Sequence, residues 1–258
     1  MSGGSQVRVE RDAAAGTAWI VLDDPDHRNA LNAALVAELK EALAEAGEDE
    51  AVRVVGLRGA GPDFCAGADL KEVKASMDAG ALAGLADADA LGELFLLLRR
   101  LPKPVVAAVH GRALAGGCGL ATACDLIVAS RDAEFGYPEV RLGFVPAMVM
   151  AILRRSLGEK QAFALVATGD RFDAGRAFEL GLVHRVLDAG AFEEKAAAFV
   201  AELAGRSASA VALTKRLLYQ LDGAGFEEGI RTGAEVNALA RFTEDCRAGI
   251  ERFLERRG

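Results

Sequence analysis

Apolar residues gather in short runs along the first two-thirds of the chain, and amphipathic stretches separate these runs. Apolar runs of this length, bounded by turn residues, are typical of buried strands. They occupy residues 17–24, 52–59, 103–111 and 125–130. Between the first two, leucines recur every four residues among charged residues, which predicts an amphipathic helix over residues 29–49. Strands that alternate with helices favour parallel pairing through helical crossovers, and hence an α/β fold.

The pattern changes twice after the second predicted strand. A loop leads into a stretch rich in alanine and aspartate, which we expect to be flexible, and a helix follows over about residues 87–101. From Pro146 onward helical patterns dominate, and only residues 181–187 interrupt them as a strand. The predicted helices cover residues 146–157, 159–168, 173–180, 191–204, 207–221 and about 226–257. No linker separates the two parts, so we expect the helical tail to pack on the core or on another subunit.

Composition and charge narrow the functional classes. With 258 residues, of which 52% are hydrophobic, the chain can bury one large core. A net charge of −8 argues against a nucleic-acid partner. The N-terminal residues lack the apolar core of a signal peptide, and the longest apolar runs are too short to span a membrane. These features predict a cytoplasmic protein with no membrane partner.

Cysteines and histidines do not form a metal-binding pattern. Cys118 and Cys124 are spaced too widely for a ligand pair, and neither Cys65 nor Cys246 completes one. We therefore predict free thiols in a reducing compartment and no metal site. The three histidines are scattered, and His110, at the end of a predicted strand, is expected to form a local hydrogen bond.

The first segment with candidate chemistry is "FCAGADLKE", residues 64–72. It leads from a predicted strand into a polar helix. The backbone N–H of Ala68 could point outward at this turn and donate to a developing oxyanion. The alternative is a plain strand-to-helix connection in which Asp69 lies near the helix start.

The second segment is "GRALAGGCGLATACD", residues 111–125, with three glycines within four positions. Glycine lets main chain or a ligand approach closely, and the free N–H groups of a helix N-terminus favour negative charge. Gly116 is then the natural donor, although tight packing of the helix on a sheet could also select glycine. A dinucleotide-binding turn is excluded because the preceding strand ends too early, at Val109, and the third glycine is missing.

The third segment is "FGYPEVRLGFVP", residues 135–146. Glu139 follows Pro138 in apolar surroundings, where the pKa of a carboxyl rises towards values useful in acid/base catalysis. The alternative is a solvated loop glutamate, which is the commoner situation for this residue type. No G-x-S-x-G motif occurs, which argues against a serine hydrolase.

Taken together, these segments resemble the crotonase superfamily, the enoyl-CoA hydratases and isomerases. The resemblance spans nearly the whole chain with order and spacing preserved. The similar segments are residues 27–32, 64–72, 103–130, 135–146, 181–187 and 243–257. The resemblance implies a spiral core of β-β-α turns over residues 1–200. It also implies a helical C-terminal region, residues 201–258, that builds homotrimers or homohexamers.

The resemblance also implies an acyl-CoA thioester as substrate, so that CoA arrives with the substrate and no other cofactor is needed. The N–H groups of Ala68 and Gly116 would hold the thioester carbonyl. The remaining predicted CoA-binding residues are Arg28 and Lys71 at the adenine and phosphate end, Asp69 and Leu70 beside the pantetheine, and Ala66. Lys215 in the tail is considered as a cross-subunit phosphate contact and is not adopted.

One departure from the family concerns the acid/base residues. Well-known hydratases carry two glutamates, one at the position of Gly119 here and one at that of Glu139. With Glu139 alone, the enzyme could still hydrate a 2-enoyl-CoA, which we predict first. It could instead move a double bond as an enoyl-CoA isomerase, or only bind acyl-CoA without turnover. Glu72 and Asp78 are the candidates for a second carboxylate.

A second departure follows Pro146, where many relatives continue with a glycine-rich segment. Here the chain reads "AMVMAIL", so Ala147, Met148 and Met150 add apolar bulk near Glu139. Ordinary core packing is the first interpretation of these residues. If they line the acyl pocket instead, they would keep it dry.

Overall fold

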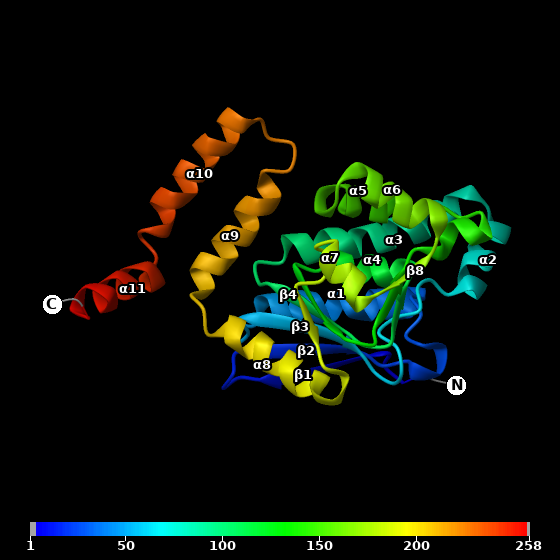
Figure 1. The fold of residues 1–258 in the computed structure, drawn as a ribbon, viewed down its shortest axis with the longest axis horizontal. Coiled ribbons are helices and arrows are strands. Elements are labelled where there is room, and N and C mark those ends of the chain that lie inside the picture. The colour runs from blue at the N-terminus through cyan, green and yellow to red at the C-terminus, as the bar shows by residue number, and fades with distance from the viewer. Residues whose placement is uncertain (1–3, 257–258) are drawn as a thin grey trace.

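The main sheet of the computed structural model, which describes residues 4–256, has six strands (Figure 1). In spatial order they are β1 (Val7–Asp12), β2 (Thr17–Leu22), β3 (Val54–Gly59), β4 (Val105–Val109), β6 (Leu126–Ser130) and β9 (Arg185–Leu187). Only β1 and β2 pair antiparallel, and every later pair is parallel. The four strands predicted from apolar runs and their parallel pairing are therefore confirmed.

A second, three-stranded sheet lies beside the first. Its strands are β5 (Arg112–Leu114), β7 (Glu134–Gly136) and β8 (Arg171–Asp173). Each has three residues, too few to produce a hydrophobic period, and the sequence analysis missed all of them. It also missed β1, whose residues are mostly half-buried or exposed at the edge of the main sheet. The small sheet matters for function because the third candidate segment begins in β7.

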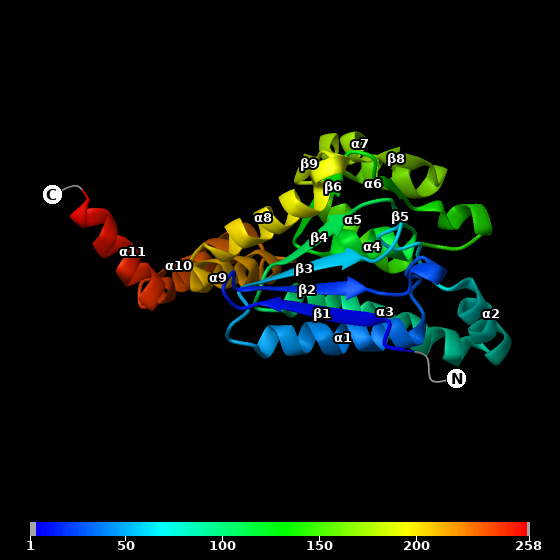
Figure 2. The same ribbon diagram turned by 90° about the horizontal axis from the view of Figure 1, so that it is seen from below.

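Helices cover both faces of the main sheet (Figure 2). One face carries α1 (Ala33–Glu48), α3 (Ala81–Arg100) and α4 (Gly116–Ala123). Alternate strand residues such as Val55 and Leu57 join their apolar sides in the larger core. On the other face, α8 (Phe192–Ala204) packs against the intervening residues Val54 and Val106. This period-two division of strand side chains between two cores is what a sheet covered on both sides requires.

The remaining helices follow the predicted order. They are α2 (Leu70–Ala79), α5 (Ala147–Ser156), α6 (Glu159–Thr168), α7 (Ala174–Glu179), α9 (Ala208–Gln220), α10 (Phe226–Ala240) and α11 (Glu244–Glu255). Single-turn helices are η1 (Pro25–His27), η2 (Pro138–Leu142) and η3 (Ala189–Ala191). Among residues 4–256, no single helix is long and apolar enough to cross a membrane. One pair of helices passes the same test by length and composition when its members are taken together. It consists of residues Ala189–Ala204, which include α8, and α9, and the two are bent by 96° relative to each other.

Three of the predictions about secondary structure are wrong. The stretch expected to be flexible is helical, because its many alanines are the best helix formers, and Gly80 at φ +103° only divides α2 from α3. The tail helix expected over 226–257 is broken before Thr243, whose side chain caps α11 by accepting from the N–H of Cys246. The strand expected over 181–187 is confined to β9, because Gly181 at φ +83° turns the chain.

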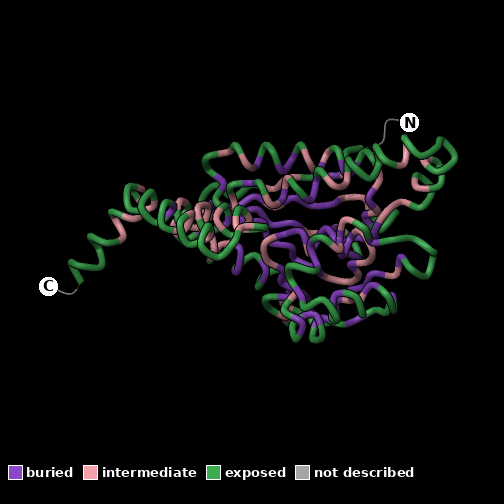
Figure 3. The backbone as a smooth tube through the Cα atoms, turned by 90° about the horizontal axis from the view of Figure 1, so that it is seen from above, coloured by how far each residue is buried: buried purple, intermediate pink, exposed green. Residues whose placement is uncertain are grey.

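The last three helices, α9 to α11, form an arm that extends from the body, and much of its surface is exposed (Figures 1 and 3). A buried ion pair ties the arm to the core. The Nζ of Lys215 lies 2.7 Å from Asp125 Oδ2 and also donates to the carbonyl oxygens of Leu98 and Lys103. The hydroxyl of Tyr219 donates to the other oxygen of Asp125, at 2.7 Å. Lys215 is thus a buried anchor, which agrees with leaving it out of the predicted phosphate contacts.

Breaking this pair should destabilise the protein. Lys215→Met keeps the aliphatic length but leaves the Asp125 carboxylate buried without its cation, so we expect a loss of about 3–5 kcal/mol in the free energy of unfolding. Urea denaturation measures it. Lys160→Met, on the exposed side of α6, is the matched control and should change the value by less than about 0.5 kcal/mol. Equal, small losses in both variants would contradict the anchoring role.

Candidate active site

The candidate segments meet because main chain pairs directly with main chain. The N–H of Leu31 donates to the carbonyl of Gly67 at 2.7 Å, which joins the "HRNALN" turn to the first segment. The N–H of Leu114 donates to the carbonyl of Cys65 at 3.0 Å and so joins the first segment to the second. The N–H of Ala115 donates to the carbonyl of Gly136 at 2.8 Å, which brings in the third.

The two predicted oxyanion donors lie next to each other. A Cβ placed on Gly116 would be 3.8 Å from the backbone nitrogen of Ala68. Within residues 4–256, neither of these two N–H groups donates to a protein acceptor. Gly116 is the first residue of α4, so the positive end of the helix dipole reinforces its N–H. Two unused donors side by side can bind one carbonyl oxygen.

Unusual backbone conformations on both sides aim these donors. Ala115 has φ +49°, a left-handed conformation that costs a residue with a Cβ about 1–3 kcal/mol. Gly67 has φ +100°, and a Cβ there would lie 2.8 Å from the carbonyl oxygen of Leu114. The glycine is required at this turn by both conformation and space. A positive-φ residue thus stands immediately before each donor, strained at Ala115 and unstrained at Gly67.

Glu139 is buried rather than solvated, which excludes the alternative interpretation of this residue. It lies in η2 with 7% of its surface exposed. Its Oε2 is fully buried and has no hydrogen-bond partner among the described residues. Burial disfavours the charged form and raises the pKa of this carboxyl. An unpartnered buried acceptor with a raised pKa is the kind of group that proton transfer uses.

An apolar wall occupies the position at which relatives carry a first glutamate. A Cβ on Gly119 would lie 2.6 Å from Val149 Cγ2 and 3.4 Å from Phe95 Cζ. Both residues are buried, and sequence reasoning did not find them. The unusual "AMVMAIL" segment was the available signal, because α5 presents Val149 to α4. Met148 and Met150 are half-buried and pack on the core, as their first interpretation held, whereas Ala147 is exposed.

Neither candidate for a second carboxylate is directed at this site. Glu72 is exposed, and its Oε2 accepts a hydrogen bond of 2.7 Å from the N–H of Ala33. Asp78 is exposed and forms an ion pair with Lys74 one helical turn earlier. Both of these carboxylates are thus engaged elsewhere, whereas Glu139 lies three residues after Gly136, whose carbonyl accepts from the N–H of Ala115 beside Gly116.

The predicted CoA-binding residues lie along the exposed edge of the first segment. The side chain of Arg28 is 56% exposed and 3.9 Å from the buried carboxylate of Asp63. Lys71 is exposed at the start of α2 and close enough to His27 to affect its titration. The hydrogen bond with Asp24 raises the pKa of His27, which lies on the same exposed edge. Sequence reasoning missed His27 as part of this group.

The residues predicted beside the pantetheine form the start of α2. The carboxylate of Asp69 accepts from the N–H of Lys71 at 2.7 Å, so Asp69 caps the helix, as the alternative interpretation held. The N–H of Ala66 donates to the carbonyl of Arg28 at 3.0 Å. Leu70 is 61% exposed. Capping and ligand binding are compatible here, because the cap uses the side chain of Asp69 and leaves the adjoining N–H of Ala68 free.

The other predictions about single side chains can be compared directly. Cys65, Cys118 and Cys124 are buried, Cys246 is half-buried, and all four are free thiols, as predicted. The ring Nε2 of His110, directly after β4, lies 2.9 Å from the carbonyl oxygen of Gly61. The expected hydrogen bond is thus present, but its partner is 49 residues away in the chain rather than local.

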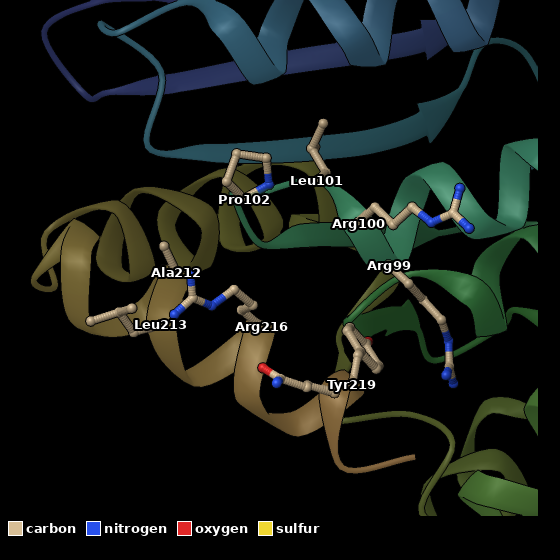
Figure 4. Close-up of a pocket in the computed structure, with 9 residues that line it drawn as sticks. Arg99, Arg100, Leu101, Pro102, Ala212, Leu213, Arg216 and Tyr219 are labelled. Carbon is tan, nitrogen blue, oxygen red and sulfur yellow. The ribbon is translucent and has the colours of Figure 1, made fainter. Parts of the chain in front are cut away.

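A cavity of about 430 Å³ lies away from this site, between the end of α3 and α9 (Figure 4). Arg99, Arg100 and Arg216 border it, but their side chains point in different directions. Arg99 is already paired with Asp222 at 2.7 Å. The cavity therefore lacks converging cations, and it belongs to the joint between body and arm.

Comparison with known proteins agrees with this geometry. The model of the enoyl-CoA hydratase/isomerase family matches residues 12–258. A Thermus thermophilus protein named as a candidate enoyl-CoA hydratase is 43% identical, over 97% of this chain and 98% of its own length. The 2,3-dehydroadipyl-CoA hydratase of Escherichia coli is 35% identical over 92% of both chains.

Solved structures give the same result for the fold. The crystal structure of an enoyl-CoA hydratase from Mycobacterium smegmatis matches with a TM-score of 0.92 and 34% identity, over 97% of this chain and 96% of that one. An enoyl-CoA hydratase from Bacillus anthracis matches with a TM-score of 0.90 and 32% identity, over 97% and 96%. The architecture is the crotonase fold with a helical C-terminal region, as the sequence predicted. The chain belongs to the enoyl-CoA hydratase/isomerase family.

The apolar wall gives a stability test. Gly119→Ala places a methyl group 2.6 Å from Val149 Cγ2, so we expect overpacking to cost about 1–3 kcal/mol of unfolding free energy. In Gly119→Ala/Val149→Ala this extra cost should disappear. Gly84→Ala in α3, where a Cβ meets nothing within 4 Å, is the control and should be neutral or slightly stabilising. If Gly119→Ala and Gly84→Ala have the same unfolding free energy in urea denaturation, Val149 and Phe95 do not fill the space over Gly119.

Proposed function

We propose that the protein is an enoyl-CoA hydratase that adds water across the double bond of a 2-enoyl-CoA thioester with one carboxylate. The single observation that carries this proposal is the buried, unpartnered Oε2 of Glu139 in a site that also has two unused backbone donors. The names of the relatives support the same reaction class.

In the proposed reaction the thioester oxygen accepts hydrogen bonds from the N–H groups of Ala68 and Gly116. Ionised Glu139 takes a proton from water, and the water oxygen bonds to C3. The electron pair of the C2=C3 bond moves to the thioester oxygen as an enolate, which the two donors stabilise. Glu139 then returns the proton to C2, which closes the cycle. Losing one such donor typically costs about 2.7–4 kcal/mol of barrier.

Isomerisation is the second candidate, and the wall of Val149 and Phe95 favours it. An ordered water needs two to four polar partners, and this wall supplies none on the side of Gly119, where the family resemblance places the first glutamate. Moving a double bond from C3 to C2 requires no water. Glu139 would remove a proton from C2 and return it to C4 through the same enolate, so one carboxylate suffices.

The remaining parts of the proposal concern the ligand and its surroundings. Arg28 and Lys71, with His27, would bind the phosphate end of CoA, and the start of α2 would flank the pantetheine. Both reactions use acid/base chemistry alone, so we propose that the enzyme needs no metal or redox cofactor. The proposed location is the cytoplasm.

We also propose that the arm mediates assembly into a homotrimer or a dimer of trimers. It carries large exposed apolar side chains, which water disfavours in a group of this size. They are Leu218, Phe226, Ile230, Leu239, Phe242, Ile250, Phe253 and Leu254. Sedimentation equilibrium should give three or six times the chain mass of 26.9 kDa. Phe226→Asp/Phe242→Asp should lower it, and a monomeric wild type would contradict the assembly.

The function is tested by the absorbance of the conjugated thioester when purified protein is mixed with crotonyl-CoA. We expect the wild type to remove this absorbance and Glu139→Gln to be slower by about 10²–10⁴-fold, the usual contribution of a general acid/base group. No loss with crotonyl-CoA, but a gain with a 3-enoyl-CoA, would replace hydration by isomerisation. Activity with neither, but binding of acyl-CoA, would identify a non-catalytic acyl-CoA-binding protein.

The pH profile of the same reaction checks the role of Glu139. The mechanism starts from ionised Glu139, whose pKa is raised by burial. The value of kcat/KM should therefore rise with pH through a midpoint above that of an ordinary glutamate. The unfolded chain ionises at lower pH, so ionising Glu139 costs stability as pH rises. At neutral pH, Glu139→Gln should melt at or above the wild-type temperature, which shows that its lost activity is not a folding defect.

A further inference from the structure

A buried tyrosine links the segment that carries Glu139 to the helix that carries Gly116. Tyr137 is completely buried, two residues before Glu139. Its hydroxyl lies 2.7 Å from Oγ1 of Thr122, in the second turn of α4. Thr122 also donates to the carbonyl oxygen of Cys118 one turn earlier. A hydroxyl has one proton, so Thr122 accepts from Tyr137, and the phenol is the donor.

Two further contacts join the same pair of elements. The N–H of Ala115 donates to the carbonyl of Gly136, as described above. The thiol of Cys118 interacts with the hydroxyl of Tyr137 and with the backbone of Gly136. Burial raises the pKa of this thiol to about 12, so it remains neutral. Residues 136–137 are thus attached to α4 at its start, through Ala115, and along its length, through Cys118 and Thr122.

The chain on the other side of Glu139 is less constrained. Val140, Leu142 and Phe144 are exposed. Arg141 is paired with Asp170, but both side chains are more than half exposed, and such pairs contribute about 0–1 kcal/mol. The end of α6 touches the outer side of η2 near Gly169. The N–H of Phe144 donates to the carbonyl of Glu139 at 3.0 Å, but this bond lies within the same loop. The attachment of Glu139 to α4 therefore comes from the residues just before it.

We propose that Tyr137 is a positioning residue: its hydrogen bond to Thr122 sets the distance between the Glu139 carboxylate and the Gly116 N–H. This inference rests on the proposed function, in which those two groups act on one substrate. It deepens that function by assigning a role to a side chain that touches neither group. A carboxylate displaced by about 1 Å can lose roughly 10²-fold in rate, whereas the carbonyl and CoA contacts stay in place.

The test is Tyr137→Phe, which removes only the hydroxyl. Thr122 keeps its bond to the Cys118 carbonyl, and the Cys118 thiol keeps its contact with the backbone of Gly136. We expect kcat to fall by about 10- to 100-fold and KM to change by less than about 2-fold. Tyr219→Phe is the matched control, because it removes the only other tyrosine hydroxyl, which is also hydrogen-bonded but binds Asp125 from α9 rather than the segment that carries Glu139. It should leave kcat within about 2-fold of the wild type.

Two threonine variants separate positioning from a general packing effect. Thr122→Val removes the acceptor and should lower kcat as Tyr137→Phe does, whereas Thr122→Ser keeps the hydroxyl and should restore most of the rate. The double variant Tyr137→Phe/Thr122→Val should be no slower than the slower single variant, because both remove one bond. A full additional loss in the double variant, or no rescue by serine, overturns the proposal.

Exchange of the C2 protons of butyryl-CoA in D₂O, followed by NMR, keeps this test independent of the net reaction. Exchange needs the two donors and Glu139 but neither hydration nor isomerisation. Slower exchange in Tyr137→Phe than in Tyr219→Phe supports the positioning role even if crotonyl-CoA is not hydrated, which would overturn the hydratase alone. Equal exchange in the two variants overturns the positioning role alone. No exchange in the wild type overturns both.

Discussion

Two stretches of main chain touch with no side chain between them, and the rest of the site depends on this contact. A Cβ on Gly117 would lie 2.3 Å from the carbonyl oxygen of Cys65, and one on Gly67 would lie 2.8 Å from that of Leu114. Only glycine permits so close an approach at either position. The contact places the start of α4 against the turn before α2, and for this reason the N–H groups of Gly116 and Ala68 lie side by side.

The same approach explains why the stretch of glycines contains no acid or nucleophile. Its contribution is backbone, oriented by the strained turn at Ala115 and by the helix dipole. The acid/base group that we propose, Glu139, comes from a different element, and burying it is unfavourable, since an unpartnered buried acceptor costs about 1–3 kcal/mol. Such local costs are common where a protein keeps a group ready for chemistry rather than for stability. The large apolar core on the same face of the sheet offsets them.

Apolar packing, rather than a missing side chain alone, accounts for the single carboxylate of the site that we propose. Val149 and Phe95 occupy the space over Gly119, so a glutamate there would need a different α5 as well. The sequence departs from the family at Gly119 on α4 and in the apolar segment after Pro146. These two departures are coupled, because Val149 of that segment packs against Gly119. Fold and chemistry are separable in this way because the chemistry resides in a few side chains carried by a shared scaffold.

The sequence by itself determined four of the six strands of the main sheet, the parallel pairing of these four, the family and the segments to which we assign the site. These features depend on local hydrophobic period and on motif spacing, both of which a linear pattern contains. It did not determine the edge strand β1, the three-residue strands of the second sheet, which are too short to have a period, or the helical state of residues 73–86, where alanine propensity prevailed over the expectation of a flexible stretch.

Only the tertiary structure decided whether Glu139 is buried, what fills the space over Gly119 and what Lys215 and Tyr137 do. Each answer depends on a partner distant in the chain or on another element: Val149 for Gly119, Asp125 for Lys215 and Thr122 for Tyr137. Burial and hydrogen bonding are properties of such pairs. A single sequence contains both residues of each pair, but only the folded structure shows that the two are in contact.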